Sequence, residues 1–312
     1  MDIRRMAIPT PFGEGHVNVY LLPRRPVTLI DTGIPGPRSL QSIQRGLAEA
    51  GLELADVEQV VLTHIHGDHA GGLSAILAEH DLPVYVHEFA RPWMEGGDEE
   101  AARMEAFQET FTQRCGAPRM QRRGGMRPPP AARVRYVRDG DRLEAGGRVW
   151  EVVHVPGHSR VDICLWDRET GEAVVGDHLL PEISSNAFVE PPLPDETERP
   201  RPLILYRASM ARTRALPWTT LYPGHGTPFA NHRALVDRRL EEHDERCEQI
   251  LGVLEGGATT VWEVSRALFP WLEGPQVFLG LSEVQGHLDL LEERGQVRVE
   301  PGDVWRYRPA RA

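Results

Sequence analysis

The residues best suited to chemistry lie in one short stretch, THIHGDH at residues 63–69, which directly follows the apolar run VVL at 60–62. In an extended loop, residues two apart point the same way, so His64, His66 and Asp68 can converge on one side while His69 opens the next helix. Imidazole nitrogen and carboxylate oxygen without thiolate suit a hydrolytic zinc centre or a harder ion such as manganese or iron. The stretch therefore predicts a metal site.

Three further segments place the same ligand types at the ends of apolar strands, namely PGH at 156–158, GD at 176–177 and PGH at 223–225. Layered α/β folds put their sites at strand ends, so these segments are expected to meet. The seven candidate ligands are His64, His66, Asp68, His69, His158, Asp177 and His225. Because one tetrahedral ion needs about four ligands, we expect two divalent ions, bridged by Asp177 and a water. Zinc is the default metal, with iron or manganese as alternatives.

The ordered motifs HxHxDH, PGHS, GD and PGHG resemble those of the metallo-β-lactamase-fold hydrolase superfamily, over roughly residues 10 to 230. The resemblance implies an α/β fold of the αββα sandwich type with the metals at one edge. It also implies a supporting role for Asp31, in the LIDTG segment, beneath the metal loop. By position, the resemblance assigns the first metal to His64, His66 and His158, the second to Asp68, His69 and His225, and the bridge to Asp177.

Two departures from family patterns narrow the expected substrate. β-Lactamases of this fold usually carry Cys or Ser at the bridge and are exported, whereas this chain has Asp177 and no signal-peptide pattern. Glyoxalase II members usually carry Pro-Gly-Ser after the PGH motif, where this chain has RVD at 160–162. Antibiotics and glutathione thioesters are therefore not the expected substrates.

Alternating strand and helix patterns predict the α/β core that must position these ligands. The predicted strands are 16–22, 27–30, 57–62, 83–87, 149–155, 163–166 and 173–176, and the predicted helices are 39–50 and 70–79. We assign residues 1–231 to this hydrolase domain, with a helical and Arg-rich insertion at about 90–140.

The remaining residues, 232–312, predict a small winged-helix-like C-terminal domain. A long helix is expected at 232–254, a short one capped by Thr259 or Thr260, a third capped by Ser282, and a hairpin around the PGD turn at 301–303. Residues 241–312 hold 14 acidic residues and 7 Arg, which is the wrong balance for contacts with phosphate. We interpret this domain as a packing unit or a homodimer interface.

Composition limits the classes of protein further. The chain has 312 residues, 40% of them hydrophobic, a net charge of −11, and no run of about 18 apolar residues. We therefore expect a cytoplasmic protein with no membrane association and little affinity for nucleic acid. All 35 basic residues are Arg, which excludes Schiff-base and P-loop lysines. The three Cys are too widely spaced for a disulfide framework or a Cys-based zinc site.

The favoured function is hydrolysis of a small-molecule thioester, ester or lactone by a metal-bridging hydroxide, with Asp68 and Asp177 as the catalytic carboxylates. The alternative is a phosphodiesterase or endoribonuclease acting on single-stranded nucleic acid. Its support is the segment 114–142, where nine Arg stand against two Asp. We interpret that segment as a lid over an anionic substrate or as a solvated loop. A third hypothesis is a metal-bearing effector-binding protein without turnover.

Overall fold

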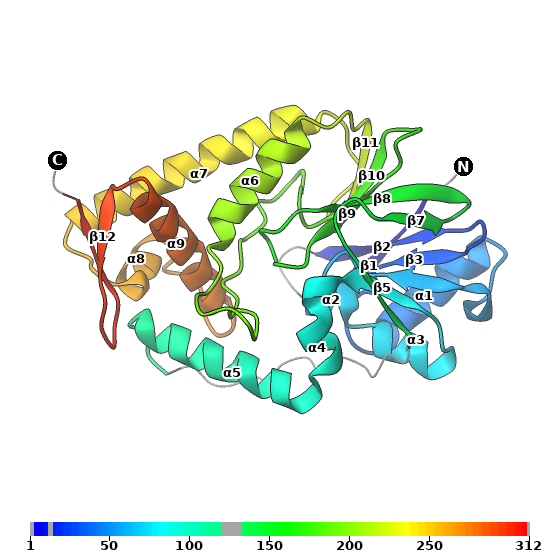
Figure 1. Cartoon of the computed structure of the whole chain (residues 1–312), viewed down its shortest axis with the longest axis horizontal. Coiled ribbons are helices and arrows are strands. Elements are labelled where there is room, and N and C mark those ends of the chain that lie inside the picture. The colour runs from blue at the N-terminus through cyan, green and yellow to red at the C-terminus, as the bar shows by residue number, and fades with distance from the viewer. Residues whose placement is uncertain (1–2, 12–14, 120–132, 311–312) are drawn as a thin grey trace.

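The computed structural model describes residues 3–11, 15–119 and 133–310. Its larger part contains two β-sheets packed face to face (Figure 1). The first has the order β1 (Arg4–Pro9), β2 (His16–Leu22), β3 (Thr28–Ile30), β4 (Gln59–Val61), β5 (Val84–His87), β6 (Val134–Val137). The second has the order β11 (Thr220–Pro223), β10 (Glu172–Gly176), β9 (Ile163–Trp166), β8 (Arg148–His154), β7 (Arg142–Ala145). Strands β3 to β6 run parallel, and so do β10 and β11.

Alternating apolar residues along the strands explain why the sheets stack. In β4, Val60 packs toward an outer helical layer, while the next residue, Val61, joins the cluster between the two sheets. In β8, Val152 belongs to the cluster between the sheets, and Val153 packs outward against the other helical layer. Successive strand residues face opposite sides of a sheet, so both sheets are covered on both faces.

The outer layers are helical. Over the first sheet lie α1 (Pro37–Glu49) and α3 (Leu73–Glu79), and against the second lie α6 (Pro202–Arg214) and α7 (His232–Glu255). The expected αββα sandwich is thus confirmed. The sequence prediction lacked β1, β6, β7 and α6. The segment expected as an insertion up to residue 140 in fact ends in β6, which pairs with β5.

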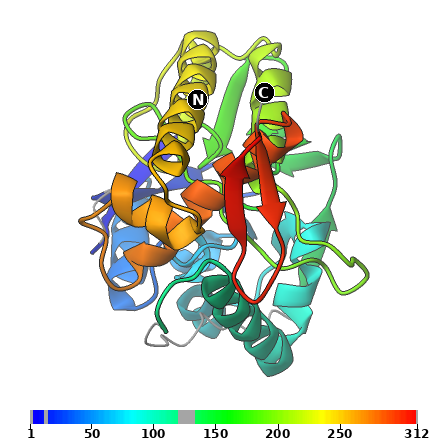
Figure 2. The same ribbon diagram turned by 90° about the vertical axis from the view of Figure 1, so that its left-hand side faces the viewer.

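The insertion contributes two helices, α4 (Arg91–Glu95) and α5 (Gly97–Arg114). Helix α5 reaches from the first sheet to the C-terminal region and lies below that region in Figures 1 and 2. Phe111 of α5 packs against Phe278, with ring centroids 5.7 Å apart, and the backbone N–H of Trp305 donates to Arg114. The insertion therefore packs on the C-terminal region.

The C-terminal region contains the end of α7, α8 (Val261–Leu268), α9 (Gln276–Glu293), and a hairpin of β12 (Val297–Glu300) and β13 (Arg306–Pro309). Thr260 caps α8 as expected. The prediction that Ser282 caps the last helix is wrong, because α9 begins six residues earlier and Ser282 is buried inside it. Apolar residues 277, 281, 284, 288 and 291 share one helical face, which extends the helix toward its N-terminus.

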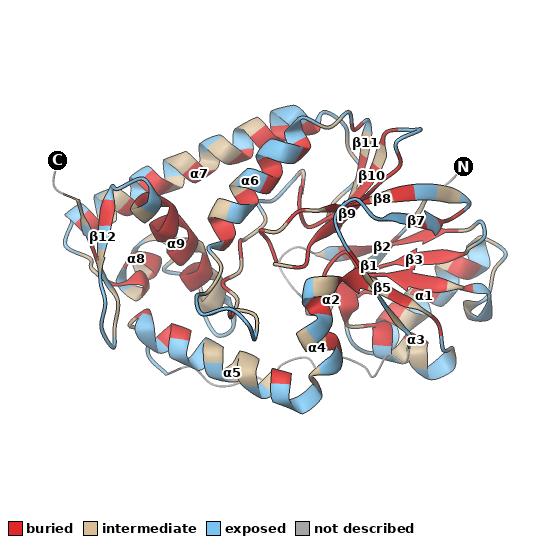
Figure 3. Ribbon diagram, in the orientation of Figure 1, coloured by how far each residue is buried: buried red, intermediate tan, exposed pale blue. Residues whose placement is uncertain are grey.

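One hydrophobic cluster runs from the outer face of the second sheet through α6 and α7 to α8, α9 and the hairpin. Figure 3 shows α9 almost entirely buried within this packing. The domain boundary at residues 231 and 232 and the winged-helix character of the tail stay predictions. Among the described residues, no helix is long and apolar enough to cross a membrane.

Candidate metal centre

All seven candidate ligands lie together at one edge of the two sheets. The first four follow β4 and enter the short helix α2 (Gly67–Ala70), and the others follow β8, β10 and β11. Their ligand atoms form three overlapping groups, each with all its atoms within 4.8 Å of one another. The groups are His64, His66 and His158; His64, His69 and Asp177; and Asp68, His69 and His225.

Asp177 lies between the two ends of this cluster. Its Oδ1 is 3.3 Å from His69 Nε2, and its Oδ2 is 3.5 Å from His225 Nε2 and 3.6 Å from His158 Nε2. Asp68 lies on the same side as His225, with 3.3 Å between Oδ2 and Nε2. One carboxylate thus contacts ligand atoms of both triads that the family resemblance assigns to separate ions.

Several of these atoms are buried without any hydrogen-bond partner among the described residues, namely His64 Nε2, His69 Nε2 and Asp177 Oδ1. A buried polar atom left without a partner costs free energy, so such atoms are rare unless a ligand or ion completes them. Three unpartnered ligand atoms in one cluster fit a bound cation. The donor set fits zinc, iron or manganese.

The electrostatics of the cluster also favour positive charge. Burial alone would lower the pKa of His69, but the carboxylates of Asp177, Asp68 and Asp31 raise it well above its usual value. At His225, too, burial lowers the pKa, but the carboxylates of Asp177 and Asp68 outweigh it and raise the pKa to about 10. Without a metal, protons on these two imidazoles balance the buried carboxylates. A divalent cation supplies the same charge and displaces the protons.

The other end of the cluster, where imidazoles face one another, behaves differently. Burial, followed by the unfavourable interaction of two protonated imidazoles with His158 so close, lowers the pKa of His66 to about 3. His66 Nδ1 lies only 2.8 Å from His158 Nε2. These imidazoles therefore stay neutral, which is the form that binds metals.

Asp31 supports the metal loop, as its place in the LIDTG segment suggested. Its Oδ2 accepts hydrogen bonds from His69 Nδ1 and Thr63 Oγ1, both at 2.8 Å, and its Oδ1 accepts one from the Thr63 backbone at 2.8 Å. Asp31 has a φ of 64°, a left-handed conformation that Asp and Asn adopt more readily than most residues. These bonds leave His69 Nε2 free to face the cluster.

Two other ligands are oriented by backbone carbonyls, which the sequence analysis did not find. His158 Nδ1 donates to the Asn186 carbonyl at 2.8 Å, and His225 Nδ1 donates to the His16 carbonyl at 2.7 Å. Asn18 and Tyr20 hold the loop of His225, because both side chains donate to the Pro223 carbonyl. A carbonyl partner leaves no side-chain signal in a sequence, so these contacts require the fold.

Glycine at position 224 is required by close packing behind the cluster. A Cβ there would lie 2.1 Å from Asp177 Oδ1 and 2.6 Å from His69 Cε1. Any side chain at this position would displace two of the candidate ligands. The PGH motif at 223–225 therefore supplies both a ligand and the space beside it.

Other histidines near the motifs do not join the cluster. His178 is buried, and its Nε2 bonds to Thr213 of α6 at 2.8 Å, so it does not reach the rim where substrate contact was considered. His154 stacks on His87 with ring centroids 3.7 Å apart, and its Nε2 donates to the Arg160 carbonyl. These residues support strands and loops around the centre.

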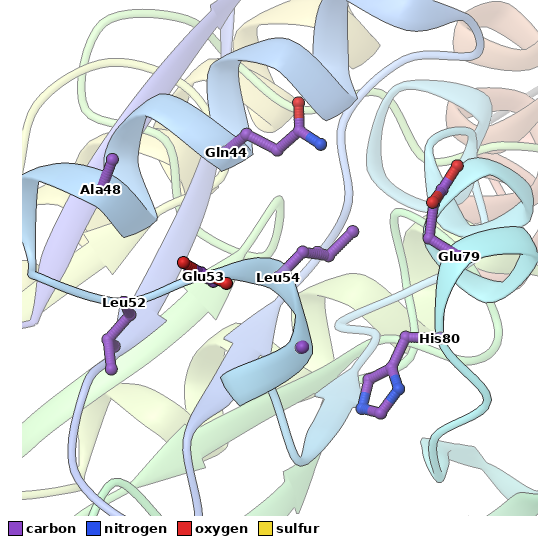
Figure 4. Close-up of a pocket in the computed structure, with 8 residues that line it drawn as sticks. Gln44, Ala48, Leu52, Glu53, Leu54, Glu79 and His80 are labelled. Carbon is purple, nitrogen blue, oxygen red and sulfur yellow. The ribbon is translucent and has the colours of Figure 1, made fainter.

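A hollow on the described surface lies apart from the cluster. One hollow of about 420 Å³ lies between α1, α3 and the 3-10 turn η1 (Leu54–Asp56), and its lining includes Gln44 and His80 (Figure 4). It contains none of the seven candidate ligands. The chemistry is assigned to the histidine and aspartate cluster because the grouped ligand atoms lie there.

Two stacked sheets between helical layers, with a buried His and Asp cluster at one edge, define a metal-dependent hydrolase of the αββα class. The chain belongs to the metallo-β-lactamase superfamily, because the family model of that description matches residues 12–225. The "Probable metallo-hydrolase YqjP" of Bacillus subtilis is 32% identical over 298 residues, which cover 93% of this chain and 92% of the relative.

Two solved structures are similar over nearly the whole chain, and a further relative is similar over part of it. The metallo-beta-lactamase family protein TTHA1429 of Thermus thermophilus is 28% identical, with a TM-score of 0.81 and 98% of each chain covered. A Beta-lactamase domain protein from Burkholderia ambifaria is 27% identical, with a TM-score of 0.75, covering 99% of this chain and 92% of that one. Acyl-coenzyme A thioesterase MBLAC2 of Gallus gallus is 37% identical over 119 residues, 38% of this chain and 40% of that protein.

Proposed function

We propose that this hydrolase uses two metal ions to cleave a small-molecule thioester, ester or lactone. The observation that carries the proposal is the position of Asp177, whose two oxygens face ligand atoms of both triads within 3.6 Å. In this proposal His64, His66 and His158 hold one ion, Asp68, His69 and His225 hold the other, and Asp177 bridges them. Zinc is the proposed metal, with iron or manganese as alternatives.

When bound, such a pair supplies a hydroxide nucleophile near neutral pH and polarises the substrate carbonyl oxygen. The protein's own residues then have distinct tasks. Asp177 is almost fully buried and serves to hold the ions, whereas the Asp68 side chain is 21% exposed and faces the open side. His69 and His225 lower the pKa of Asp68 to about 2 against the effect of burial. In the metal-loaded enzyme, coordination to the cation would keep the Asp68 carboxylate ionised, and its free oxygen would be able to accept a hydrogen bond from the attacking water.

The charge of the protein supports a small substrate over nucleic acid. The net charge is −11, and phosphate contacts require basic surface. In the Arg-rich segment, three of the described Arg side chains are paired with acids: Arg119 with Glu109, Arg133 with Asp81, and Arg138 with Glu88. Arg122, Arg123 and Arg127 lie outside the described residues. Among thioesters, acyl-coenzyme A compounds are our first choice, because one relative carries that activity in its name.

We further propose that residues 232–312 form a packing unit of the hydrolase and not a nucleic-acid module. The region carries twice as many acidic residues as Arg after residue 240, as the sequence shows. Its apolar residues share one cluster with α6 and the second sheet.

The test is a parallel screen of zinc-, iron- and manganese-loaded protein against acyl-coenzyme A thioesters, lactones, simple esters and labelled single-stranded RNA. We expect turnover of a carbonyl substrate that is lost after chelation and restored by metal. D177N, which keeps the shape of the bridging residue, serves as the inactive control. RNA cleavage that depends on Asp177, with no turnover of any ester, thioester or lactone, would replace this proposal with the nuclease function.

A further inference from the structure

A short segment, residues 185–189, lies between a candidate metal ligand and helix α9 of the C-terminal region. On one side, the Asn186 carbonyl accepts the hydrogen bond from His158 Nδ1, and Ser185 Oγ lies 2.9 Å from the same nitrogen. On the other side, the Asn186 side-chain amide donates to the Leu279 carbonyl of α9 at 3.0 Å. One residue thus contacts both the metal ligand and the helix.

Phe188 and Val189 repeat this double attachment. The backbone N–H of Phe188 donates to the His158 carbonyl at 3.1 Å, and the Phe188 ring centroid lies 4.6 Å from that of His66. The backbone N–H of Val189 donates to Ser282 Oγ of α9 at 3.3 Å. The segment is therefore fixed at both ends, with its aromatic ring against the imidazoles.

Helix α9, which makes these contacts, is itself anchored at several points. Leu279 and Ser282 are three residues apart and lie on the same side of the helix. Farther along α9, Asp289 forms a two-point ion pair with Arg199, at 2.6 and 2.7 Å. Gly286 lets the helix approach Leu203 of α6, since a Cβ there would lie 3.1 Å from the Leu203 side chain. A helix held at several points can hold the segment in turn.

We propose that α9 takes part in the metal centre, and that Asn186 is a positioning residue which transmits the geometry of α9 to His158. A histidine that binds a metal needs its other nitrogen bonded to fix the ring orientation, and loss of such partners costs about 10- to 100-fold in metal affinity or activity. The bond from the Asn186 side chain to α9 holds the Asn186 backbone in place, and the carbonyl of that backbone orients the His158 ring. The expected effect of its side chain is at the lower end of that range.

The test compares N186A, S282A and E292Q in the full chain. N186A removes the bond to Leu279, S282A removes the bond to Val189, and E292Q removes a surface ion pair with Arg201 near the other end of α9. Zinc affinity is measured by competition with a chromophoric chelator, and cobalt spectra report the geometry of the ligands. We expect about tenfold weaker zinc binding for N186A, a smaller loss for S282A, an altered cobalt spectrum for both, and no change for E292Q.

The inference rests on the metal site of the proposed function, but the experiment distinguishes failure of the metal site from failure of the role given to α9. Wild-type protein that binds no metal would end both. Wild-type protein that binds zinc while N186A and S282A bind it equally well would overturn the role of α9 alone. Loss of stability toward urea in the metal-free variants, with zinc affinity unchanged, would also overturn it, because it would show a structural role only. S282A loses only a hydroxyl group, so it keeps the test valid should N186A fail to fold.

Discussion

Replacing Asp31 by Asn separates the charge of this residue from its backbone conformation. Asn also tolerates the left-handed φ of 64°, so the loop keeps its shape. The Asp31 carboxylate accepts three hydrogen bonds, from His69 Nδ1, Thr63 Oγ1 and the Thr63 N–H. The amide of Asn has one oxygen, so in either orientation its NH₂ group faces at least one of these donors.

The size of the effect follows from the bonds lost. A hydrogen bond to a charged group contributes about 1.5 to 3 kcal/mol, and a tenfold change in affinity corresponds to about 1.4 kcal/mol. In either orientation His69 no longer faces a carboxylate, and loss of this charged partner predicts about 10- to 100-fold weaker binding of the metal held by that imidazole, the range typical of partners behind a metal ligand. Asp31 is buried, so solvent does not weaken this contribution.

The assay is metal content after equilibration with graded concentrations of a chelator, followed by turnover with excess metal. We expect D31N to lose metal at lower chelator concentration and to regain part of its activity when metal is added back. D167N is the matched control, since Asp167 is also buried and accepts turn N–H groups, but lies at the opposite end of the second sheet. Equal metal affinity of D31N and wild type would refute the role given to Asp31.

Three further predictions follow from the same geometry. Protein purified without chelator should contain close to two metals per chain by elemental analysis, and a value that stays at one after reconstitution would contradict the bridged centre. D177A should abolish hydrolysis while leaving the circular dichroism spectrum intact, and near-normal turnover would show that the ligand assignment is wrong. Burial, followed by the charge of His287, lowers the pKa of His243 in α7 to about 3. Because the unfolded state binds this proton more readily, stability should be full above about pH 6.5 and fall by up to about 1.4 kcal/mol per pH unit as the pH drops from there toward 3. Urea unfolding of H243Q should show a shallower loss over that window, and an unchanged slope would refute the assignment.

The sequence predicted more of the candidate site than of the secondary-structure elements that hold it. The seven candidate ligands stand in compact motifs, and their side-chain chemistry is visible in the residue types themselves. Asn186 was missed because its contribution to His158 is a backbone carbonyl, which every residue possesses. Only the folded segment 185–189 shows which carbonyl is used.

The strands and the helix that the sequence analysis missed have only weak local patterns. Residues 142–145 alternate exposed and buried along β7, and Val137 is the buried end of β6, but the many Arg in this region favoured a loop. Helix α6 opens with Pro202 at its first position, a common start signal, yet its mixed apolar and basic residues gave no clear periodicity. Charge and composition outweighed local pattern in these places.

The hydrogen bonds between β2 and the loop of His225 determine when, during synthesis and folding, this part of the site becomes complete. His16 and Asn18 near the start of the chain bond to residues 225, 223 and 224, about two hundred positions later. Contacts between residues so distant in sequence form late, because the intervening chain must first be ordered. During synthesis the ion assigned to His225 therefore has no complete site until that residue has left the ribosome. Binding at the complete site stabilises a chain that is already folded as far as β11.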